Sequence, residues 1–460
     1  MIGQLAVKSL AAHPVRSAVL AAGFGIGVAV MAILLGVAQI VLDQSRAPML
    51  AGGGDVVIEL GPYVPAPLVL SSSLQPAPIR SQIRVAAPVQ TATLYMRRAD
   101  TIVRVRARGG IPSLERRLGD PEASGIAAWR DTPEDAAWME NDPEEVLRAI
   151  DRFSDIPDVP EWSSSWAEWL YFNGRAAGAQ FYLTFLTGPA RADGLRSAGV
   201  RLQLDRGQGI ETFTGAAPIS RADALSAPDL TIGASRVRLE GVEYHIHLDL
   251  RDARNRRATG DLTIEGSPGR MVPRIEIVGT RRWRTGYVVP VMSGPLRGTL
   301  EVDGARVSFD DGVGYHDHNW GFWKGVSWQW GQVHHDDLSL VYGRVFPPPE
   351  AADPQRLPGF AGLIGPDGPL GYTNDVAITE RNDANGRPLA IEVVARGPAM
   401  ELRTSFAVTS SVVTRTGGPM ALASGLDFLQ LRGAYTVRGR VGGRDVHFTA
   451  PGSAETFRGR

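Results

Sequence analysis

The chain has 460 residues, of which 43% are hydrophobic and 21% charged, and it contains 53 glycines and 32 prolines. This composition is typical of globular proteins and excludes a disordered, collagen-like or coiled-coil chain. Forty-eight basic residues against 49 acidic ones leave a net charge of −1, so the charge gives no support for a nucleic-acid partner. Because the chain has no cysteine, it has no disulfide, thiolate metal site, cysteine nucleophile or lipid-modified cysteine.

The N-terminal region contains one long apolar segment. Ser17 to Leu42 carries no charged residue, and a helix of this length spans roughly 39 Å, enough to cross a hydrocarbon core of about 30 Å. Lys8 and Arg16 precede the segment, so the positive-inside tendency places the N-terminus in the cytoplasm. We expect residues 1–43 to form a cytoplasmic stub and a single-pass anchor in the inner membrane, with the bulk of the protein in the periplasm.

Two further interpretations concern this segment. Gly36-Val37-Ala38 places small residues where a signal peptidase cleaves, so a removed signal peptide is the alternative to an anchor. Leu5–Leu10, His13–Arg16 and Gly23–Val28 together resemble the first transmembrane helix of macrolide-export-type ABC transporter permeases. That resemblance implies ABC transporter subunits as partners, but later apolar helices like those of the permeases are missing from the sequence, so we expect no transport pore.

The next two regions are short. Residues 44–135 contain β-like runs among proline- and glycine-rich stretches and are predicted to form a β-containing connector. Residues 136–160 are predicted to form an amphipathic helical linker. Its start is indicated by Asp142 as a cap, Pro143 in the first turn and Glu145 as a capping-box acid. The apolar face that docks on a neighbouring domain consists of Val146, Leu147, Ile150 and Phe153.

From residue 161 the apolar pattern has a period of two, which is typical of antiparallel strands. Hairpin turns are indicated at Asn385-Gly386, Asp303-Gly304 and Gly442-Gly443. Trp169 is followed by Tyr182, and Trp328 by Tyr342, at nearly the same spacing, which suggests a repeated unit of two strands. We therefore expect a mainly β protein with two tandem antiparallel β-barrels, residues 161–300 and 301–460, after the transmembrane helix.

One window concentrates the groups that could do chemistry. Four of the eight histidines lie between 316 and 335, and four of the ten tryptophans between 320 and 330. Imidazoles among large aromatic rings suit a pocket that holds an apolar ligand beside proton-transfer groups.

Within this window, His316-Asp317-His318-Asn319-Trp320-Gly321 resembles the signature of the carotenoid 1,2-hydratase (hydroxyneurosporene synthase) family. Glu168–Gly174 is similar to the matching segment of related lipocalin-like secreted proteins, often described as predicted hydrolases and found with ABC transporters. The resemblance covers residues 140–460. It implies two tandem lipocalin-like barrels and a carbon–oxygen lyase that adds water to a terminal isoprenoid double bond.

The resemblance also assigns roles to residues. The candidate catalytic residues are Asp317, His318, Trp320 and Tyr342. The candidate substrate-binding residues are His316, Trp323, Trp328, Trp330 and Arg344. Trp320, with Trp328 or Trp330, could stabilise a carbocation through its ring face. Arg344 stands where the family has an acid, and an arginine cannot donate a proton in its place, which leaves enzymatic activity open.

Other interpretations of the same residues stay open. The histidines could tie a barrel rim together by hydrogen bonds, and the tryptophans could be barrel core. His316, His318, His334 and His335 could bind zinc or iron, although we expect no metal and no other cofactor. Ser-hydrolase chemistry has little support because no Gly-x-Ser-x-Gly elbow occurs.

The sequence thus predicts a membrane-anchored hydratase-like protein that acts on a long apolar isoprenoid, carotenoid-like, or lipid substrate. The alternative is a non-catalytic carrier of a hydrophobic small molecule that works with an ABC transporter. In both cases the expected partners are the lipid bilayer and the hydrophobic ligand.

Overall fold

The computed structural model describes residues 12–50, 56–58, 82–98, 101–133, 135, 142–267, 269–366, 368–415 and 426–459. The chain divides into two compact units, residues 1–59 with 85–136 and residues 60–84 with 137–460. Each unit is described by itself.

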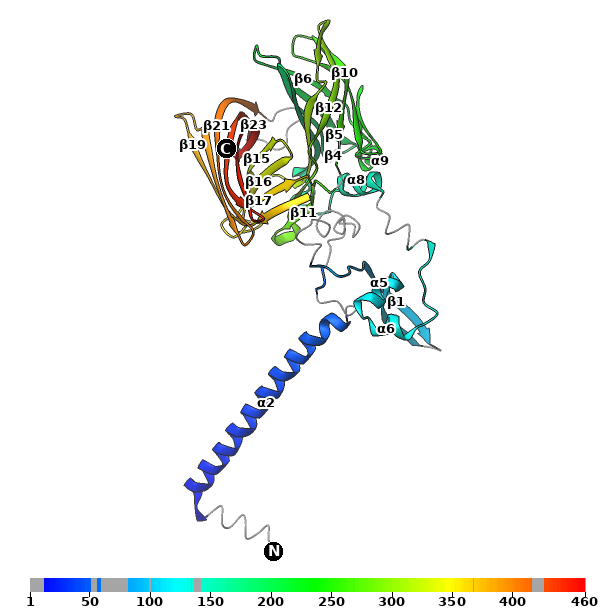
Figure 1. The fold of residues 1–460 in the computed structure, drawn as a ribbon, viewed down its shortest axis with the longest axis vertical. Coiled ribbons are helices and arrows are strands. Elements are labelled where there is room, and N and C mark those ends of the chain that lie inside the picture. Colours follow the sequence, from blue (N-terminus) through cyan, green and yellow to red (C-terminus); the bar gives the residue numbers. More distant parts are fainter. Residues whose placement is uncertain are drawn as a thin grey trace. The chain divides into compact units, whose positions relative to one another are not determined.

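The first unit begins with helix α2, Pro14–Leu50 (Figure 1). Among the described residues, α2 contains the one helix long and apolar enough to cross a membrane, Pro14–Val37, with a mean hydropathy of 2.5. Its apolar side chains are exposed, as Phe24 and Leu34 illustrate. This agrees with the predicted anchor, although the criteria are length and composition alone, and a signal sequence would meet them too.

The rest of the first unit is a small α/β element. Strands β1 (Val89–Arg98) and β2 (Thr101–Gly110) form an antiparallel pair, followed by helices α5 (Pro112–Leu118) and α6 (Pro121–Gly125). Arg108 of β2 forms ion pairs with Glu115 and Asp120. These pairs fasten the hairpin to the helices.

The second unit opens with helix α8, Pro143–Asp151. Asp142 caps it by accepting a hydrogen bond of 2.9 Å from the backbone N–H of Glu144, as the sequence predicted. Its buried face consists of Val146, Leu147, Ile150 and Asp151. The helix ends before Phe153, which is buried in the segment that follows.

The first sheet follows α8 and has twelve strands. They are β3 (Trp166–Ala176), β4 (Ala179–Ala190), β5 (Arg196–Asp205), β6 (Ile210–Ala216), β7 (Thr231–Ile232), β8 (Ser235–Glu240), β9 (Glu243–Arg251), β10 (Arg257–Glu265), β11 (Val272–Val278), β12 (Arg284–Val302), β13 (Ala305–Ser308) and β14 (Gly312–Phe322). Short helices lie at η1 (Ser163–Ser165), α9 (Arg221–Leu225) and η2 (Thr280–Arg282).

This sheet closes on itself. Its order runs β10-β12-β14-β3-β4-β5-β6-β9, and β9 also pairs with β10. The closed ring therefore contains eight antiparallel strands, and closure removes the exposed strand edges that an open sheet would have.

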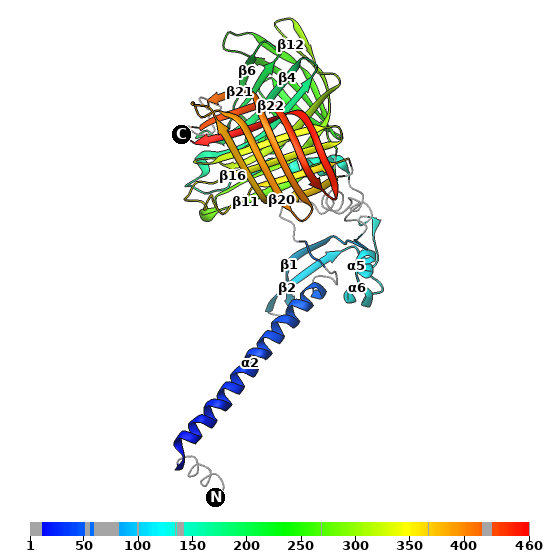
Figure 2. The same cartoon turned by 60° about the vertical axis from the view of Figure 1, so that its left-hand side comes forward.

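The second sheet has nine strands in the order β18-β17-β16-β15-β23-β22-β21-β20-β19. They are β15 (Ser327–His335), β16 (Leu338–Phe346), β17 (Phe360–Gly365), β18 (Gly368–Thr373), β19 (Asp375–Asn382), β20 (Pro388–Gly397), β21 (Met400–Arg415), β22 (Leu426–Val441) and β23 (Arg444–Gly459). The end strands β18 and β19 are separated in sequence by Asn374 alone, so the sheet curls back on itself (Figure 2).

Two hydrophobic cores support the sheets. One core fills the first barrel and continues to Trp328 and Phe457 of the second sheet, while the other lies within the second sheet around Tyr435 and Phe406. Contacts such as Trp169 with Trp328, at 5.6 Å between ring centroids, join the two sheets. The interface between the sheets is therefore part of the folded core.

The mainly β fold with two barrel-like antiparallel sheets and one apolar N-terminal helix is confirmed. All three predicted hairpin turns connect consecutive strands: β12 to β13, β19 to β20, and β22 to β23. The sheets divide between Phe322 and Ser327. The division expected between residues 300 and 301 falls inside β12, which continues to Val302 and pairs with β13 and β14 of the first sheet.

Candidate functional site

Strand β14 carries the motif that the sequence singled out. It lies between β12 and β3 in the first sheet, and every residue from Gly314 to Phe322 is buried. Successive side chains of a strand point to opposite faces. The strand therefore presents His316, His318 and Trp320 on one face and Tyr315, Asp317 and Asn319 on the other.

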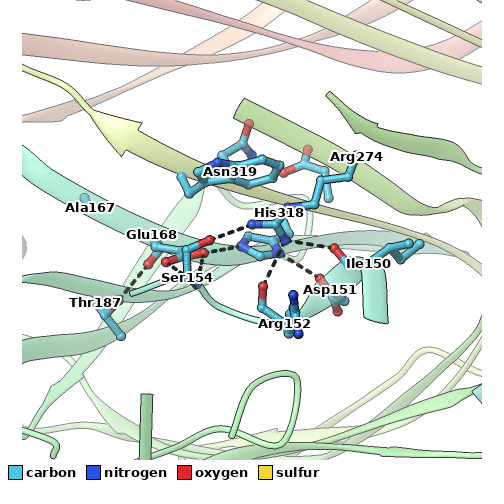
Figure 3. A network of polar contacts seen from close by, with 12 residues as sticks. Ile150, Asp151, Arg152, Ser154, Ala167, Glu168, Thr187, Arg274, His318 and Asn319 are labelled. Atoms are coloured by element: carbon cyan, nitrogen blue, oxygen red, sulfur yellow. Dashed lines mark hydrogen bonds and ion pairs between the residues drawn. The ribbon is translucent and has the colours of Figure 1, made fainter. Parts of the chain in front are cut away.

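The first face holds a chain of buried ionisable groups that we call the histidine network: Asp151, Glu168, His316 and His318. Nε2 of His316 lies 2.9 Å from Oδ2 of Asp151, and Nε2 of His318 lies 3.0 Å from Oε1 of Glu168. Nδ1 of His318 is 3.2 Å from Oδ1 of Asp151, close enough for an ion pair. Figure 3 shows His318 between the two carboxylates. All four side chains are fully buried.

The donors and acceptors of this network indicate its charge. Burial alone would raise the pKa of Asp151, but the charge and hydrogen bonds of His316, followed by those of His318, lower it to about 2. The carboxylate of Asp151 can therefore only accept hydrogen bonds. Nδ1 of His316 faces the carbonyl oxygen of Tyr171 at 2.9 Å, another acceptor, so both ring nitrogens of His316 face hydrogen-bond acceptors.

The aromatic ring of the motif is already covered. The guanidinium of Arg274 lies over Trp320, 3.7 Å from the ring centroid. The same guanidinium donates to the carbonyl oxygens of Ile150 and Arg152 at 3.1 and 2.9 Å, and to the hydroxyl of Ser154 at 2.7 Å (Figure 3). The ring face of Trp320 thus binds a cation of the protein itself, which fills the place expected for a carbocation.

The histidine network joins three elements. Asp151 is the last residue of α8, Glu168 lies in β3, and the histidines lie in β14. The carboxylate of Glu168 also accepts from the backbone N–H of Ser154 at 2.9 and 3.0 Å. These contacts fix α8 and the segment after it against the barrel.

The opposite face of β14 carries a second acidic cluster, which sequence reasoning missed in part. Asp317 interacts electrostatically with Glu455 of β23, and we call these two residues the acid pair. Burial, followed by the charge of Glu455, holds the pKa of Asp317 well above its usual range. Burial raises the pKa of Glu455 to about 7, against the lowering effect of the Tyr171 hydroxyl and Gln430. Both carboxyl groups of the acid pair therefore keep their protons to a higher pH than an exposed acid does.

The acid pair lies beside an aromatic cavity of about 120 Å³ between the sheets. Its lining includes Asn319, Tyr287, Trp323, Trp328, Trp330, Arg344 and Phe360. Two contacts connect it to Asp317. The Asn319 amide donates to Oδ1 of Asp317 at 2.6 Å, and the indole N–H of Trp330 donates to the hydroxyl of Tyr315 at 3.1 Å, which itself interacts with Asp317.

The structure brings only some of the predicted site residues together. Trp323, Trp328, Trp330 and Arg344 line the aromatic cavity, together with Leu357 and Pro358 of the loop after β16. His316, His318 and Trp320 lie on the other face of β14 and line neither this cavity nor the second one described below.

The four predicted catalytic residues are not assembled into one site. Asp317 faces away from His318 and Trp320. Tyr342 lies in the core of the second sheet, where its hydroxyl is 3.0 Å from that of Tyr435. No motif marks Glu455 in the sequence, since it stands alone in a C-terminal strand.

Metal ligation was one of the open interpretations. Among the described residues, no group of three or more histidine, aspartate or glutamate side chains is arranged to hold a metal ion. His334 lies on β15, where its Nδ1 is 3.2 Å from the hydroxyl of Ser339, and it does not join His316 and His318.

The sequence matches no protein-family model and no curated protein. The solved structures that are similar to this chain include the following three. A Nitrosomonas europaea protein described as an AttH is 15% identical with a TM-score of 0.43, over 63% of this chain and 92% of that one. Kievitone hydratase from Nectria haematococca is 15% identical with a TM-score of 0.42, over 67% and 95%. CghA is 13% identical with a TM-score of 0.39, over 67% and 94%. At such low TM-scores these likenesses do not bear on the activity of this chain.

Proposed function

We propose that the space between the two sheets binds the unsaturated end of an apolar molecule in the aromatic cavity, and that Asp317 gives it a proton so that water can add. The observation that carries this proposal is a fully buried carboxyl group whose pKa is raised by burial and by the charge of Glu455, and which is hydrogen-bonded to a residue of the cavity wall. Enzymes use burial in this way to keep a carboxylic acid in its proton-donating form.

The size of the cavity limits what it holds. A cavity of roughly 150 Å³ accommodates benzene, so the smaller volume of about 120 Å³ limits the bound group to a few carbon atoms, such as the branched end of an isoprenoid. The remainder of a carotenoid-like chain would extend along the interface towards solvent. The substrate class is the one implied by the motif of β14, but the proposed proton donor is Asp317 rather than His318.

The proposed reaction balances as an addition of water. The proton of Asp317 forms a bond to one alkene carbon, and the positive charge develops on the more substituted carbon. The faces of Trp328, Trp330 and Tyr287 in the cavity wall would stabilise this charge by about 2 kcal/mol when desolvated. A water oxygen then bonds to the cation, and its surplus proton returns to the carboxylate of Asp317. The step requires Asn319 to release Asp317 when the ligand enters.

A carrier without chemistry is the second candidate, and one observation favours it. The residues that line the aromatic cavity include no carboxyl group and no imidazole. Such a lining binds an apolar molecule without placing a proton donor directly against it. The predicted partnership with ABC transporter subunits belongs to this function.

One experiment separates the two functions. Full-length protein in detergent is incubated with lycopene or geranylgeraniol in ¹⁸O-labelled water, and bound and released molecules are identified by mass spectrometry. The enzyme function predicts a labelled alcohol that Asp317→Asn abolishes, while Asp311→Asn, an exposed neighbour, leaves the rate unchanged. If the wild type and Asp317→Asn each bind one unmodified ligand per protein, the result supports the carrier function. If neither a product nor a bound ligand is found, both the enzyme function and the carrier function are rejected.

The proposed location follows from α2. The segment Pro14–Val37 would anchor the protein in the inner membrane with residues 137–460 in the periplasm, because Arg16 and Lys8 lie on the N-terminal side. An apolar ligand could then pass between the bilayer and the protein without crossing much water.

A further inference from the structure

A second cavity, of about 170 Å³, also lies between the two sheets. Its lining differs from that of the aromatic cavity because it is rich in polar and cationic groups, among them Arg175, Arg432, Asn173, Gln332 and His334. Arg175 and Asn173 belong to β3 of the first sheet, whereas Arg432 belongs to β22 of the second. We call this space the arginine cavity.

Arg432 is the central group of the arginine cavity. It is only 5% exposed, and its guanidinium lies over the ring of Tyr182, 4.7 Å from the centroid. One nitrogen, Nη1, pairs with Oδ2 of Asp205 at 2.5 Å. The other two nitrogens, Nε and Nη2, are buried and have no acceptor at hydrogen-bond geometry, although the hydroxyl of Tyr182 is close enough to interact with the guanidinium. Leaving the three N–H groups of these two nitrogens without a well-placed acceptor is costly in a buried cation.

The other lining groups increase this excess of donors. Nδ2 of Asn173 is likewise buried without a partner, while its Oδ1 already accepts from Gln332 at 3.3 Å. The guanidinium of Arg175 donates to the backbone carbonyl of Pro451 at 2.6 Å, and among the described residues it forms no ion pair with a carboxylate. Donor groups from both sheets thus converge where acceptors are scarce.

The charges around the arginine cavity favour an anion. Asp205 neutralises one of the two guanidiniums, and Arg175 leaves one positive charge in excess. Burial, followed by the charges of Arg175 and Arg270, lowers the pKa of His334, so this ring is neutral at pH 7. Glu455 is the acid that could oppose an anion, but its pKa of about 7 leaves it partly protonated.

We infer that the arginine cavity binds an oxyanion, a carboxylate or phosphate, through Arg432, Arg175 and Asn173. An oxyanion supplies several acceptor atoms at once and forms paired hydrogen bonds with a guanidinium fork. The cavity exceeds the roughly 150 Å³ that holds a benzene molecule, so either group fits. The group is either the head of an amphiphile or a free ion. This inference does not depend on proton transfer by Asp317.

Calorimetric titration of the full-length protein in a non-ionic detergent tests the inference, with inorganic phosphate, octanoate and octanol as probes. We expect at least one anion to bind and octanol to bind more weakly. If the protein binds octanoate but not phosphate, the bound group is the head of an amphiphile. If it binds phosphate, a free ion is sufficient for binding. Absence of binding by both anions would overturn the inference.

Variants assign the binding to the arginine cavity. Loss of a charge-assisted hydrogen bond weakens binding about tenfold, which we expect for Arg432→Gln and Arg175→Gln. Arg201 is a partly buried arginine of β5 that lines neither cavity. The affinity of Arg201→Gln for the anion should therefore stay within about twofold of the wild type. Because Arg432→Gln also leaves Asp205 unpaired, Arg175→Gln decides the result if the first variant does not fold. Unchanged affinity in Arg175→Gln, or equal weakening in Arg201→Gln, contradicts the assignment.

The Asp317→Asn variant separates this inference from the proposed function. It should bind the anion with the affinity of the wild type, whatever its effect on hydration.

Discussion

Asp317 and His318 are consecutive in β14, yet their side chains lie on opposite faces of the first sheet. His318 joins the histidine network with Asp151 and Glu168, whereas Asp317 faces Glu455 across the interface between the sheets. The two neighbours therefore belong to different electrostatic environments. One environment lowers the pKa of the carboxylate at the end of α8, and the other raises the pKa values of two carboxyl groups beside a cavity.

The acid pair makes stability depend on pH in a definite direction. The pKa of Glu455 rises from an ordinary 4.5 to about 7 on folding, so the folded state binds more protons than the unfolded state between these values. The free energy of unfolding therefore falls as the pH rises through this window, by on the order of 3 kcal/mol. Asp317, whose pKa is also raised, contributes a fall of the same sign.

Thermal unfolding of the full-length protein in detergent from pH 5 to pH 8 measures this slope. Glu455→Gln should flatten it, and Glu392→Gln, an exposed acid on β20, should not. The comparison between variants matters because the lowered pKa of His334 contributes a slope of opposite sign below its ordinary pKa of 6.5. An unchanged slope in Glu455→Gln would show that the acid pair titrates normally.

The histidine network predicts that removing the carboxylate of Asp151 strongly lowers the free energy of unfolding. Asp151→Asn removes the buried carboxylate that contacts both His316 and His318, and breaking a buried pair of this kind costs about 3–5 kcal/mol. Asp155→Asn is the matched control, because Asp155 pairs with Arg221 on the exposed surface and such pairs contribute less than about 1 kcal/mol. Denaturant unfolding measures the loss of stability in each of the two variants, and hydrogen exchange of α8 serves as a local probe.

The sign of the pH effect distinguishes Asp151 from the acid pair. Since the pKa of Asp151 is lowered from 3.8 to about 2, its stabilisation is present in full above pH 3.8 and is lost as the pH falls through 2. Similar small losses for Asp151→Asn and Asp155→Asn would mean that the network does not hold α8 in place.

Strand alternation and turns could be predicted from the sequence because they depend on neighbouring residues. The spacing of His316 and His318 correctly placed both rings on one face, and Asn385-Gly386 correctly marked a hairpin. The same alternation separates Asp317 from the histidines. The partners of these residues could not be predicted: Asp151 lies 165 positions from His316, and Glu455 lies on β23, the last strand of the chain and one of the central strands of the second sheet. Pairings over such distances follow from barrel closure, which leaves no local pattern.

The position of Trp320 shows the same limit. A tryptophan beside histidines suggests an open ring face, but Arg274 of another strand covers it. The other tryptophans of the window, such as Trp330, do line the aromatic cavity, as expected. Whether a ring faces a ligand or a protein cation depends on which strand packs over it.

Gly286 provides a test of the packing around Trp320. A Cβ atom at Gly286 would lie 2.2 Å from Cζ2 of Trp320 and 2.7 Å from the carbonyl oxygen of Ile275. Gly286→Ala should therefore displace the indole from Arg274 and destabilise the protein by about 1–3 kcal/mol. At Gly188 the nearest atom would lie 3.6 Å away, so Gly188→Ala should change stability by less than about 0.5 kcal/mol. Equal effects in denaturant unfolding would contradict the tight packing at Trp320.

The absence of cysteine from the sequence allows the proposed topology to be tested with single-cysteine variants. Ala12→Cys lies before the apolar segment and Ser164→Cys after it, and both positions are exposed. In intact Gram-negative cells, a maleimide that cannot cross the inner membrane should label Ser164→Cys and leave Ala12→Cys unlabelled until the cells are lysed. Carbonate extraction should leave the protein with the membranes, because an apolar helix of this length is not removed by high pH.

The alternative outcomes of this experiment are distinct. Cleavage of a signal peptide at the small residues near Ala38 would remove the cysteine of Ala12→Cys from the mature protein and release the protein from the membranes. Labelling of Ala12→Cys but not Ser164→Cys in intact cells would reverse the topology. Because the ligand proposed for the aromatic cavity is apolar and is expected to come from the bilayer, a released, soluble protein would also weaken the case for a membrane source of that ligand.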